Sequence, residues 1–195
     1  LTCVSGYALS KKTLPGRRWI MLFLLFTMYF NGGLIPTYLL VDFLGLLDSL
    51  WALILPGTIS AWNMLIMKNY FQSIPPSLEE SASLDGATPL VTLIRIIVPV
   101  SMPVVATVAL MYGVVHWNSY FNAVLYIYDQ GKMTLPIYLR MLLASTAMDQ
   151  ATQSGVAFDS AAITPETMKM ATIVASVLPI LIIYPFIQKY FVKGV

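Results

Sequence analysis

The sequence predicts an all-α integral membrane protein, a bundle of about four kinked membrane-spanning helices. Of the 195 residues, 58% are hydrophobic and only 10% are charged, whereas a soluble domain carries about 25% charged residues. The mean hydropathy is +0.77. The apolar residues gather in runs near twenty residues long, which is the length that a helix needs to cross the hydrocarbon core of a bilayer. This composition argues against a soluble enzyme, and the net charge of +2 argues against a nucleic-acid partner.

Four apolar segments are the predicted spans: about 19–40, 49–67, 103–126 and 165–190. None of them holds an Asp or Glu away from its ends. Each contains Pro or Gly, which membrane helices tolerate when neighbouring groups satisfy the freed backbone. The interrupting residues are Gly32, Gly33, Pro36, Pro56, Gly57, Gly113, Pro179 and Pro185. They indicate kinked helices around a path, and plain packing irregularity explains any single one of them equally well.

The distribution of basic residues predicts the orientation. Eight of the eleven Lys and Arg residues flank the spans on one side, which the rule makes cytoplasmic. These are Lys11, Lys12, Arg17, Arg18, Lys68, Arg95, Lys189 and Lys193. Both termini and the 68–102 loop are therefore expected in the cytoplasm. The loop 127–164 is expected outside, with a short interfacial helix in LPIYLRMLL and Thr164 capping the last span before Pro165.

The loop over residues 74–99 has the signals of two short helices joined by a glycine. Ser77 and Glu80 have the spacing of a capping box, which predicts a helix from Leu78 to about Asp85. Gly86 stands where a left-handed residue ends a helix. Thr88 and Pro89 predict the start of a second helix, which is expected to end near Val98 because Pro99 follows. Such a small helix-turn-helix suits insertion into a groove of another protein.

No motif in the chain indicates catalysis or a metal site. Cys3 is the single cysteine and His116 the single histidine, so clustered metal ligands are not expected. The sequence contains no phosphate-binding G-x-x-x-x-G-K-[ST] loop and no arrangement of nucleophile and base. We therefore predict that the chain is not an enzyme and has no cofactor of its own.

The residues of this loop resemble the E-A-A-x3-G-x9-I-x-L-P loop of permeases of ATP-driven importers. The match is Glu80-Ser81-Ala82, Gly86, Ile96 and Val98-Pro99, with Ser81 and Val98 as the two conservative departures. Further on, HWNSYFNAVLYI and TLPIYLRMLL resemble the carbohydrate branch, in particular the smaller membrane subunit of the maltose transporter and the permeases for polysaccharides. Members of that branch have six spans, so the start LTCVSGYAL is expected to belong to a longer chain whose first two spans are missing here.

The resemblance implies a permease of the type I importer fold and a set of partners. It implies a dimer of cytoplasmic ATP-binding subunits, a second permease subunit and an extracellular sugar-binding protein, in a lipid bilayer and with no nucleic acid. The loop is then the coupling helix, and ATP binds to the separate ATPase. The residues implied in ATPase contact are Glu79, Glu80, Ser81, Ala82, Asp85 and Gly86. For Glu80 the capping box remains an equal alternative.

The third predicted span contains candidates for a substrate path. Tyr112, His116 and Tyr120 are spaced i, i+4 and i+8, so one continuous helix places them on one side. Asn118 and Asn122 are then on roughly the opposite side. Tyrosines and amides suit a sugar, and interhelical hydrogen bonding explains each residue as well.

Three other functions compete with sugar import. An importer of this class for an amino acid or peptide differs only in cargo. An ion-coupled secondary transporter usually needs acidic residues within the membrane, which the spans lack. An intramembrane enzyme needs a paired catalytic constellation, and the sequence contains none.

Overall fold

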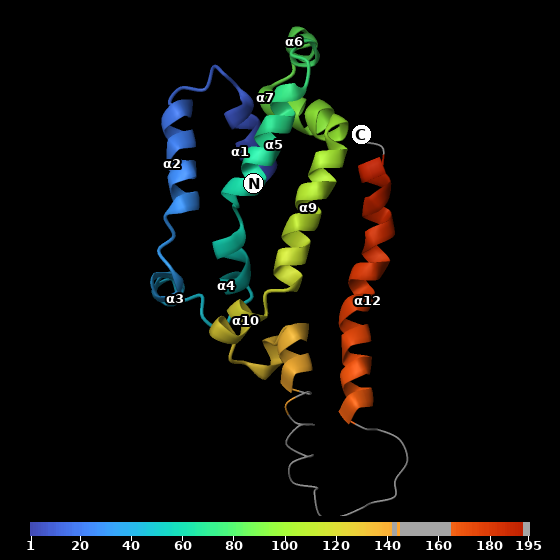
Figure 1. The fold of residues 1–195 in the computed structure, drawn as a ribbon. Coiled ribbons are helices and arrows are strands. Elements are labelled where there is room, and N and C mark those ends of the chain that lie inside the picture. The colour runs from blue at the N-terminus through green and yellow to red at the C-terminus, as the bar shows by residue number, and fades with distance from the viewer. Residues whose placement is uncertain (142–143, 145–164, 193–195) are drawn as a thin grey trace, which may run out of the picture.

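The computed structural model describes residues 1–141, 144 and 165–192. These residues form helices and no strands, which confirms the all-α prediction (Figure 1). The first half contains α1 (Thr2–Ser10), α2 (Arg17–Tyr29), α3 (Leu34–Phe43), α4 (Trp51–Ile54), the 3-10 turn η1 (Leu55–Gly57), α5 (Ala61–Ser73) and α6 (Ser77–Leu84). The second half contains α7 (Pro89–Thr92), the π-helical turn η2 (Leu93–Ile97), α8 (Val98–Val100), α9 (Met102–Trp117), α10 (Tyr120–Tyr126), the 3-10 turn η3 (Gln130–Lys132), a helix at 135–141 and α12 (Pro165–Val192).

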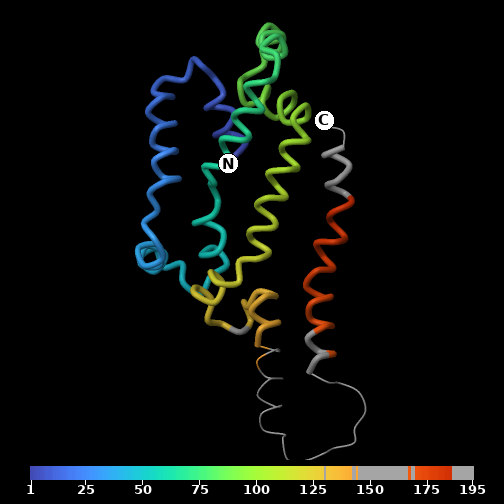
Figure 2. Tube along the Cα trace, in the orientation of Figure 1, coloured from blue at the N-terminus to red at the C-terminus, as the bar shows by residue number. Residues whose placement is uncertain are grey.

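The longer helices run between two ends of an elongated molecule. α6 and α7 lie at one end, and α10 with the helix at 135–141 lies at the other (Figure 1). In the trace of Figure 2 the chain crosses from α1 to α2 at the end where α6 lies. α1 packs against α5, and α9 packs against both α5 and α12. The segment 11–18 and the loop 68–102, which the charge distribution assigns to one side of a membrane, therefore lie at the same end of the fold.

The predicted spans are more broken than expected. In the described part of the chain no single helix is long and apolar enough to cross a membrane alone. Within α12, the apolar stretch Met170–Pro185 is shorter than a span. Two bent pairs have the length and composition to do so together, Arg17–Tyr29 with Leu34–Phe43 (bent by 114°) and Pro89–Val100 with Met102–Trp117 (87°). Segment 49–67 is divided between α4, η1 and α5, and segment 103–126 between α9 and α10. Residues 142–143 and 145–164 of the predicted outer loop, with the expected cap at Thr164, lie outside the described residues.

The break between α2 and α3 has a local cause in Asn31-Gly32-Gly33. Phe30 leaves the helix in an extended conformation, and Gly33 has a φ of 86°, which an L-residue with a side chain rarely adopts. The backbone N–H of Gly33 donates to Oδ1 of Asn31 at 3.0 Å. Pro36 then falls in the first turn of α3, where its missing N–H has no intrahelical partner to lose.

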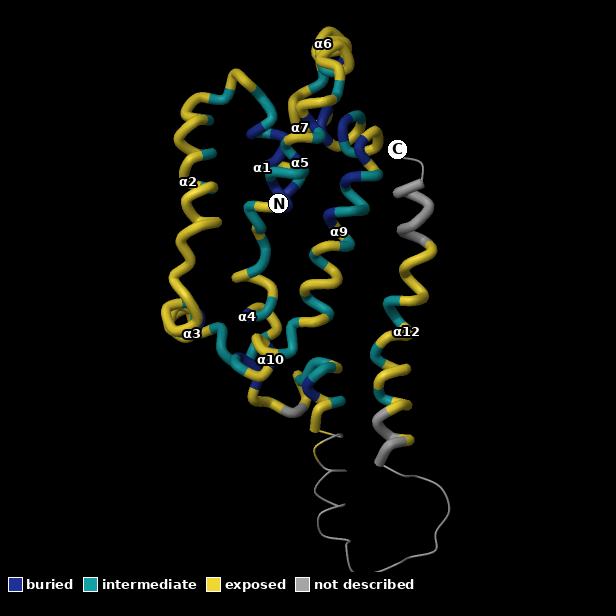
Figure 3. Tube along the Cα trace, in the orientation of Figure 1, coloured by how far each residue is buried: buried dark blue, intermediate teal, exposed yellow. Residues whose placement is uncertain are grey.

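One hydrophobic core supports the α6 end of the molecule. Its buried residues come from α1, α5, η2 and α9: Tyr7, Met67, Phe71, Leu93, Ile97, Val104 and Val108. Met67 and Ile97 are 1% and 0% exposed, so this junction excludes solvent. In contrast, α2 and α3 and most of α12 are coloured as exposed in Figure 3, and α2 has no buried residue although it is apolar. Its outer surface is therefore available to lipid or to other helices.

A polar clasp joins two loops at the opposite end. Asp48 has a positive φ of 55°, and its Oδ1 accepts hydrogen bonds from the backbone N–H groups of Asp129 (2.8 Å) and Tyr128 (3.1 Å). Lys132 Nζ donates to the backbone oxygen of Asp48 at 2.9 Å and pairs with its Oδ2 at 3.2 Å. The backbone donors, led by Asp129, hold the pKa of the Asp48 carboxyl below its usual value, and Lys132 adds to this effect.

We expect this clasp to persist on acidification until the pH falls below about 4, the pKa of an unfolded aspartate. A carboxyl whose folded pKa is depressed contributes its stability above the unfolded pKa and loses it as the pH falls through the folded value. Hydrogen exchange of the amides of Tyr128 and Asp129 at pH 7, 5 and 3 measures this. In Asp48→Asn the protection of these two amides should no longer depend on pH. Loss of protection already between pH 7 and pH 5 in the unchanged protein would contradict the assignment.

Candidate functional site

The elbow between α6 and α7 is built by a glycine C-cap. Gly86 has a φ of 76°, as predicted for a left-handed residue. Its N–H donates to the carbonyl of Ser83 at 3.0 Å, and the N–H of Ala87 donates to the carbonyl of Ala82 at 2.9 Å. This pair of bonds is the Schellman motif, which satisfies the last carbonyls of a helix. Thr88 and Pro89 then begin α7, so the chain reverses within four residues of the end of α6.

Two details of this loop were predicted wrongly. Pro76 occupies the N-cap of α6 with helical backbone angles, and Ser77 is already the first helical residue. The capping box of Ser77 and Glu80 does not form, because the cap position lies one residue earlier. The second helix does not end near Val98 either, since η2 and α8 continue it to Val100. Pro99 falls in the first turn of α8, where its fixed φ is compatible with a helix.

The six residues predicted for ATPase contact divide between two faces of the elbow. Glu80, Ser81, Asp85 and Gly86 are exposed. Ala82 is only 4% exposed, and Glu79 is turned toward α1. The helical spacing explains the division, since residues three apart share a face. The exposed set is therefore available for docking, while Ala82 and Glu79 hold α6 on the rest of the fold.

Leu84 belongs to the exposed face and was missed by the sequence reasoning. Its side chain is 89% exposed, although leucine is among the residues most often found buried. It follows Glu80 by four residues, so the two lie on one side of α6. The available signal was this spacing, which puts an apolar residue on the side of the helix opposite Ala82. α6 itself lies at the end of the molecule, beyond α1, α5 and α7 (Figure 1).

An ion pair fixes α6 to the segment after α1. The carboxylate of Glu79 pairs with Nζ of Lys11, and the two side chains are 28% and 30% exposed. Lys11 also lies 4.3 Å from the ring centroid of Tyr7, which belongs to the buried core. Partial burial lowers the pKa of the Lys11 ammonium from its ordinary value. The elbow is thereby tied to the core through Lys11.

We expect Glu79→Gln to loosen α6 and Glu80→Gln to leave it unchanged. A half-buried ion pair of this kind contributes up to about 1 kcal/mol, which corresponds to about fivefold faster local hydrogen exchange for the amides of residues 79–87. Glu80 is the matched control, because it has the same charge on the same helix and is exposed. Equal protection in the two variants would show that the Lys11–Glu79 pair contributes nothing to the elbow.

The candidates for the substrate path lie in two places. α9 ends at Trp117 with Asn118 as its C-cap, and Tyr120 and Asn122 belong to α10. The prediction of two faces on one helix is therefore wrong. The polar residues cause the break: Ser119 Oγ donates to the carbonyl of His116 at 2.7 Å and Asn118 Nδ2 to that of Val114 at 2.9 Å, and such side-chain bonds compete with continued helix.

Tyr112 and His116 lie together beside the interrupted segment before α5. A hollow of about 620 Å³ is lined by both side chains and by Gly57 and Ser60. The hydroxyl of Tyr112 accepts the backbone N–H of Ser60 at 2.9 Å and shares a hydrogen bond with Thr2 Oγ1 at 2.9 Å. A Cβ on Gly57 would come within 3.2 Å of His116 Cε1. Tyr112 therefore has a structural role between α1, α5 and α9, and His116 covers the glycine of the break.

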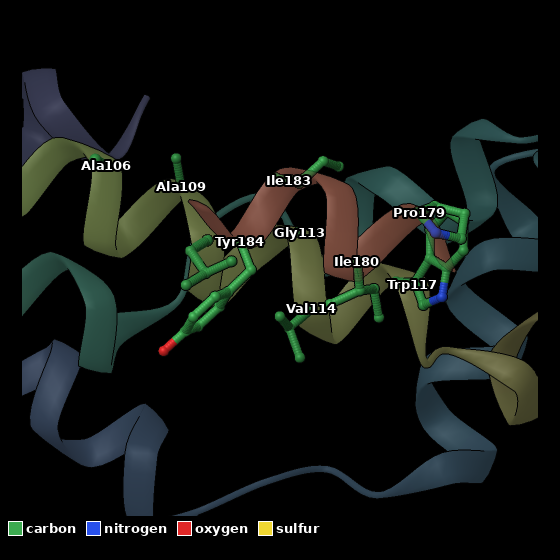
Figure 4. Close-up of a pocket in the computed structure, with 10 residues that line it drawn as sticks. Ala106, Ala109, Gly113, Val114, Trp117, Pro179, Ile180, Ile183 and Tyr184 are labelled. Atoms are coloured by element: carbon green, nitrogen blue, oxygen red, sulfur yellow. The ribbon is translucent and has the colours of Figure 1, made fainter. Parts of the chain in front are cut away.

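Asn118 and Tyr120 line a different hollow, of about 500 Å³, between the end of α9, the helix at 135–141 and α12. Asn122 is exposed and lines neither hollow. A third hollow, of about 320 Å³, lies between α9 and α12 around Gly113, Val114 and Ile180 (Figure 4). Its lining is almost entirely apolar, so it suits contact with a hydrocarbon surface better than binding of a hydroxyl-rich ligand.

Comparison with known proteins places the chain in a family. Residues 11–195 match the model of the binding-protein-dependent transport system inner membrane component. The chain belongs to this family of transport permeases. A polygalacturonan/rhamnogalacturonan transport system permease protein of Bacillus subtilis is 47% identical over 195 residues, which are 100% of this chain and 68% of that protein. The trehalose/maltose transport system permease protein of Thermococcus litoralis is 28% identical over 100% of this chain and 66% of its own length.

A solved structure shows the same fold as this permease. The crystal structure of a bacterial transporter involved in the import of the acidic polysaccharide alginate matches with a TM-score of 0.84 and 36% identity, over 98% of this chain and 67% of that chain. The type I importer fold and the permease class predicted from the loop motif are thus confirmed. The permease is a membrane transport component and not an enzyme. It spans about two thirds of the length of the relatives that it matches.

Proposed function

We propose that this permease is one membrane subunit of an ATP-driven, binding-protein-dependent importer that moves a sugar or oligosaccharide across the cytoplasmic membrane by alternating access. The observation that carries the proposal is the elbow. An exposed helix tip is fixed by a glycine cap and an ion pair to the core that joins α1, α5 and α9. The names of relatives as sugar and polysaccharide permeases support the cargo.

In this proposal the outer face of α6 docks into a cleft of a cytoplasmic ATPase subunit. Glu80, Ser81, Asp85 and Gly86, with Leu84 added, contact the ATPase. Closure of the ATPase dimer on ATP moves α6. The motion reaches α5 and α9 through the close-packed core around Met67 and Ile97, because such interiors transmit displacement instead of absorbing it. ATP binds to the partner, so the permease itself needs no cofactor.

The proposal also includes an orientation and further partners. The α6 end faces the cytoplasm, with both ends of the chain on that side. A second permease subunit completes the pathway, and an extracellular sugar-binding protein delivers the cargo to the end with α10. Within the permease, His116 and Tyr112 border one stretch of the path, and Asn118, Tyr120 and Asn122 border its outer part.

Uptake by the complete importer tests this proposal against its alternatives. The permease, its partner permease and the ATPase are reconstituted in proteoliposomes with the binding protein, and labelled oligosaccharide is supplied. We expect uptake to require ATP and the binding protein, and to persist when ionophores collapse proton and sodium gradients. Uptake that follows an ion gradient without ATP would support a secondary transporter. ATP-driven uptake of amino acids or peptides in place of sugars would overturn the cargo assignment alone.

A further inference from the structure

Arg140 lines the hollow at the end of the molecule opposite α6. It belongs to the short helix at 135–141, which lies between α10 and α12 in Figure 1. The hollow of about 500 Å³ is lined by Trp117, Asn118, Tyr120 and Arg140, and by Thr172 and Ser176 of α12. This volume is within the usual range for small-molecule sites, about 300–1,000 Å³. The lining combines aromatic rings, an amide, hydroxyls and one cation with apolar residues such as Leu139 and Ile180.

Within residues 1–141, no carboxylate pairs with the guanidinium of Arg140. The ion pairs formed there have Lys11 or Lys132 as the cation. Nη1 of Arg140 instead donates to the hydroxyl of Tyr120, and the Arg140 Cζ atom lies 5.0 Å from the centroid of the Tyr120 ring. A guanidinium has five N–H donors in a planar fork. The contact with Tyr120 therefore positions the fork and leaves donors for an anionic group.

The neighbours of Arg140 suit a sugar that carries a carboxylate. A carboxylate binds a guanidinium through two parallel hydrogen bonds, a geometry that a neutral hydroxyl cannot reproduce. The rings of Trp117 and Tyr120 offer apolar faces to a pyranose, and the side chain of Asn118 offers an amide for hydroxyl groups. A second source of carboxylates is an acidic protein surface. The concave, aromatic-lined shape of the site favours the single sugar residue over that broader surface.

We propose that Arg140 is a specificity-determining residue, which binds the carboxylate of a uronic acid unit at the outer part of the path and makes the importer prefer acidic over neutral oligosaccharides. This inference rests on the proposed sugar import and names its substrate class. The substrates in the names of two similar proteins agree with this inference: one relative is named for polygalacturonan, and one solved transporter is involved in the import of the acidic polysaccharide alginate.

Uptake of a matched pair of substrates by Arg140 variants tests the proposal. The complete importer is supplied with an oligogalacturonate trisaccharide or with its methyl ester, which has the same rings without the charge. Loss of a hydrogen-bonded charge pair is worth about 1.5–3 kcal/mol, so Arg140→Gln should lower uptake of the acid about 10- to 150-fold. Uptake of the ester should change less than twofold. Arg140→Lys should retain part of the preference, and Tyr120→Phe should reduce it by less than Arg140→Gln.

The remaining outcomes separate this inference from the function on which it rests. Equal loss of both substrates in Arg140→Gln would mean that the residue serves the binding protein or the fold, and it would overturn the inference. Unchanged uptake of both would overturn it too. An unmodified importer that transports only the ester would reject the acidic class and keep sugar import. An unmodified importer that transports neither substrate under ATP would overturn this inference, and the proposed function would fail as well only if neutral oligosaccharides were not imported either.

Discussion

Changing Leu84 to Asp is expected to lower ATP-driven uptake at least tenfold and to release the ATPase from the permease during purification. Leu84 is 89% exposed at the tip of α6, so the change removes no contact within the chain. Burial of a leucine in a partner's cleft contributes about 1.5–3 kcal/mol, and a carboxylate placed there adds a desolvation cost. The measurement is co-purification of the ATPase together with uptake, at equal amounts of permease in the membrane.

The matched control for this change is Leu44→Asp. Leu44 is 56% exposed and caps α3 at the end of the molecule away from α6. The same charge is introduced at another exposed leucine, and we expect the ATPase to remain bound. Retention of both the ATPase and normal uptake in Leu84→Asp would show that the outer face of α6 is not the docking surface.

Changing Gly6 to Val is expected to have the largest effect on stability. α1 approaches α5 so closely that a Cβ on Gly6 would come within 3.1 Å of Met67 Cγ, 3.2 Å of Met67 Cβ and 3.4 Å of the backbone nitrogen of Lys68. Met67 is 1% exposed and has little room to move. Overpacking of this kind costs about 1–3 kcal/mol. For a chain of this size the Tm of the purified permease should fall by about 2–4 °C per kcal/mol.

Gly113→Ala is the control for this second change. Gly113 also lies within a helix, α9, but no atom lies within 4 Å of the position of its Cβ. Alanine favours helix over glycine by about 1 kcal/mol, so the Tm should stay the same or rise. If Gly6→Val left the Tm unchanged, α1 would have to be free to move away from α5, and the tie between α6 and the core would be looser than the structure shows.

Local signals predicted the elbow well because they act over only a few residues. A glycine after a short helix predicts a left-handed cap, and Gly86 has that conformation. Thr88 followed by Pro89 predicts a helix start, and α7 begins there. The predicted cap at Ser77 failed by one residue, because two successive prolines let the helical backbone begin at Pro76. Boundaries at this scale depend on small differences between adjacent positions.

The interior of the apolar segments was less predictable. Composition alone allowed a continuous third span, and the division at Asn118 and Ser119 comes from side-chain hydrogen bonds to the last turn of α9. Tyr120 consequently lies beside Arg140 instead of following His116 along one helix. A periodicity argument assumes that the helix continues, so it fails wherever polar side chains end the helix early.

The sequence by itself determined that this protein is a helical membrane component, and its loop motif identified the permease class, because charge content and turn chemistry are properties of neighbouring residues. Only the tertiary structure decided which face of α6 is exposed, that Glu79 pairs with Lys11, and that Arg140 shares a hollow with Asn118 and Tyr120. Those facts depend on how segments distant in sequence pack together. An apolar sequence shows that its residues are excluded from water, but it does not specify which residues they contact in the folded protein.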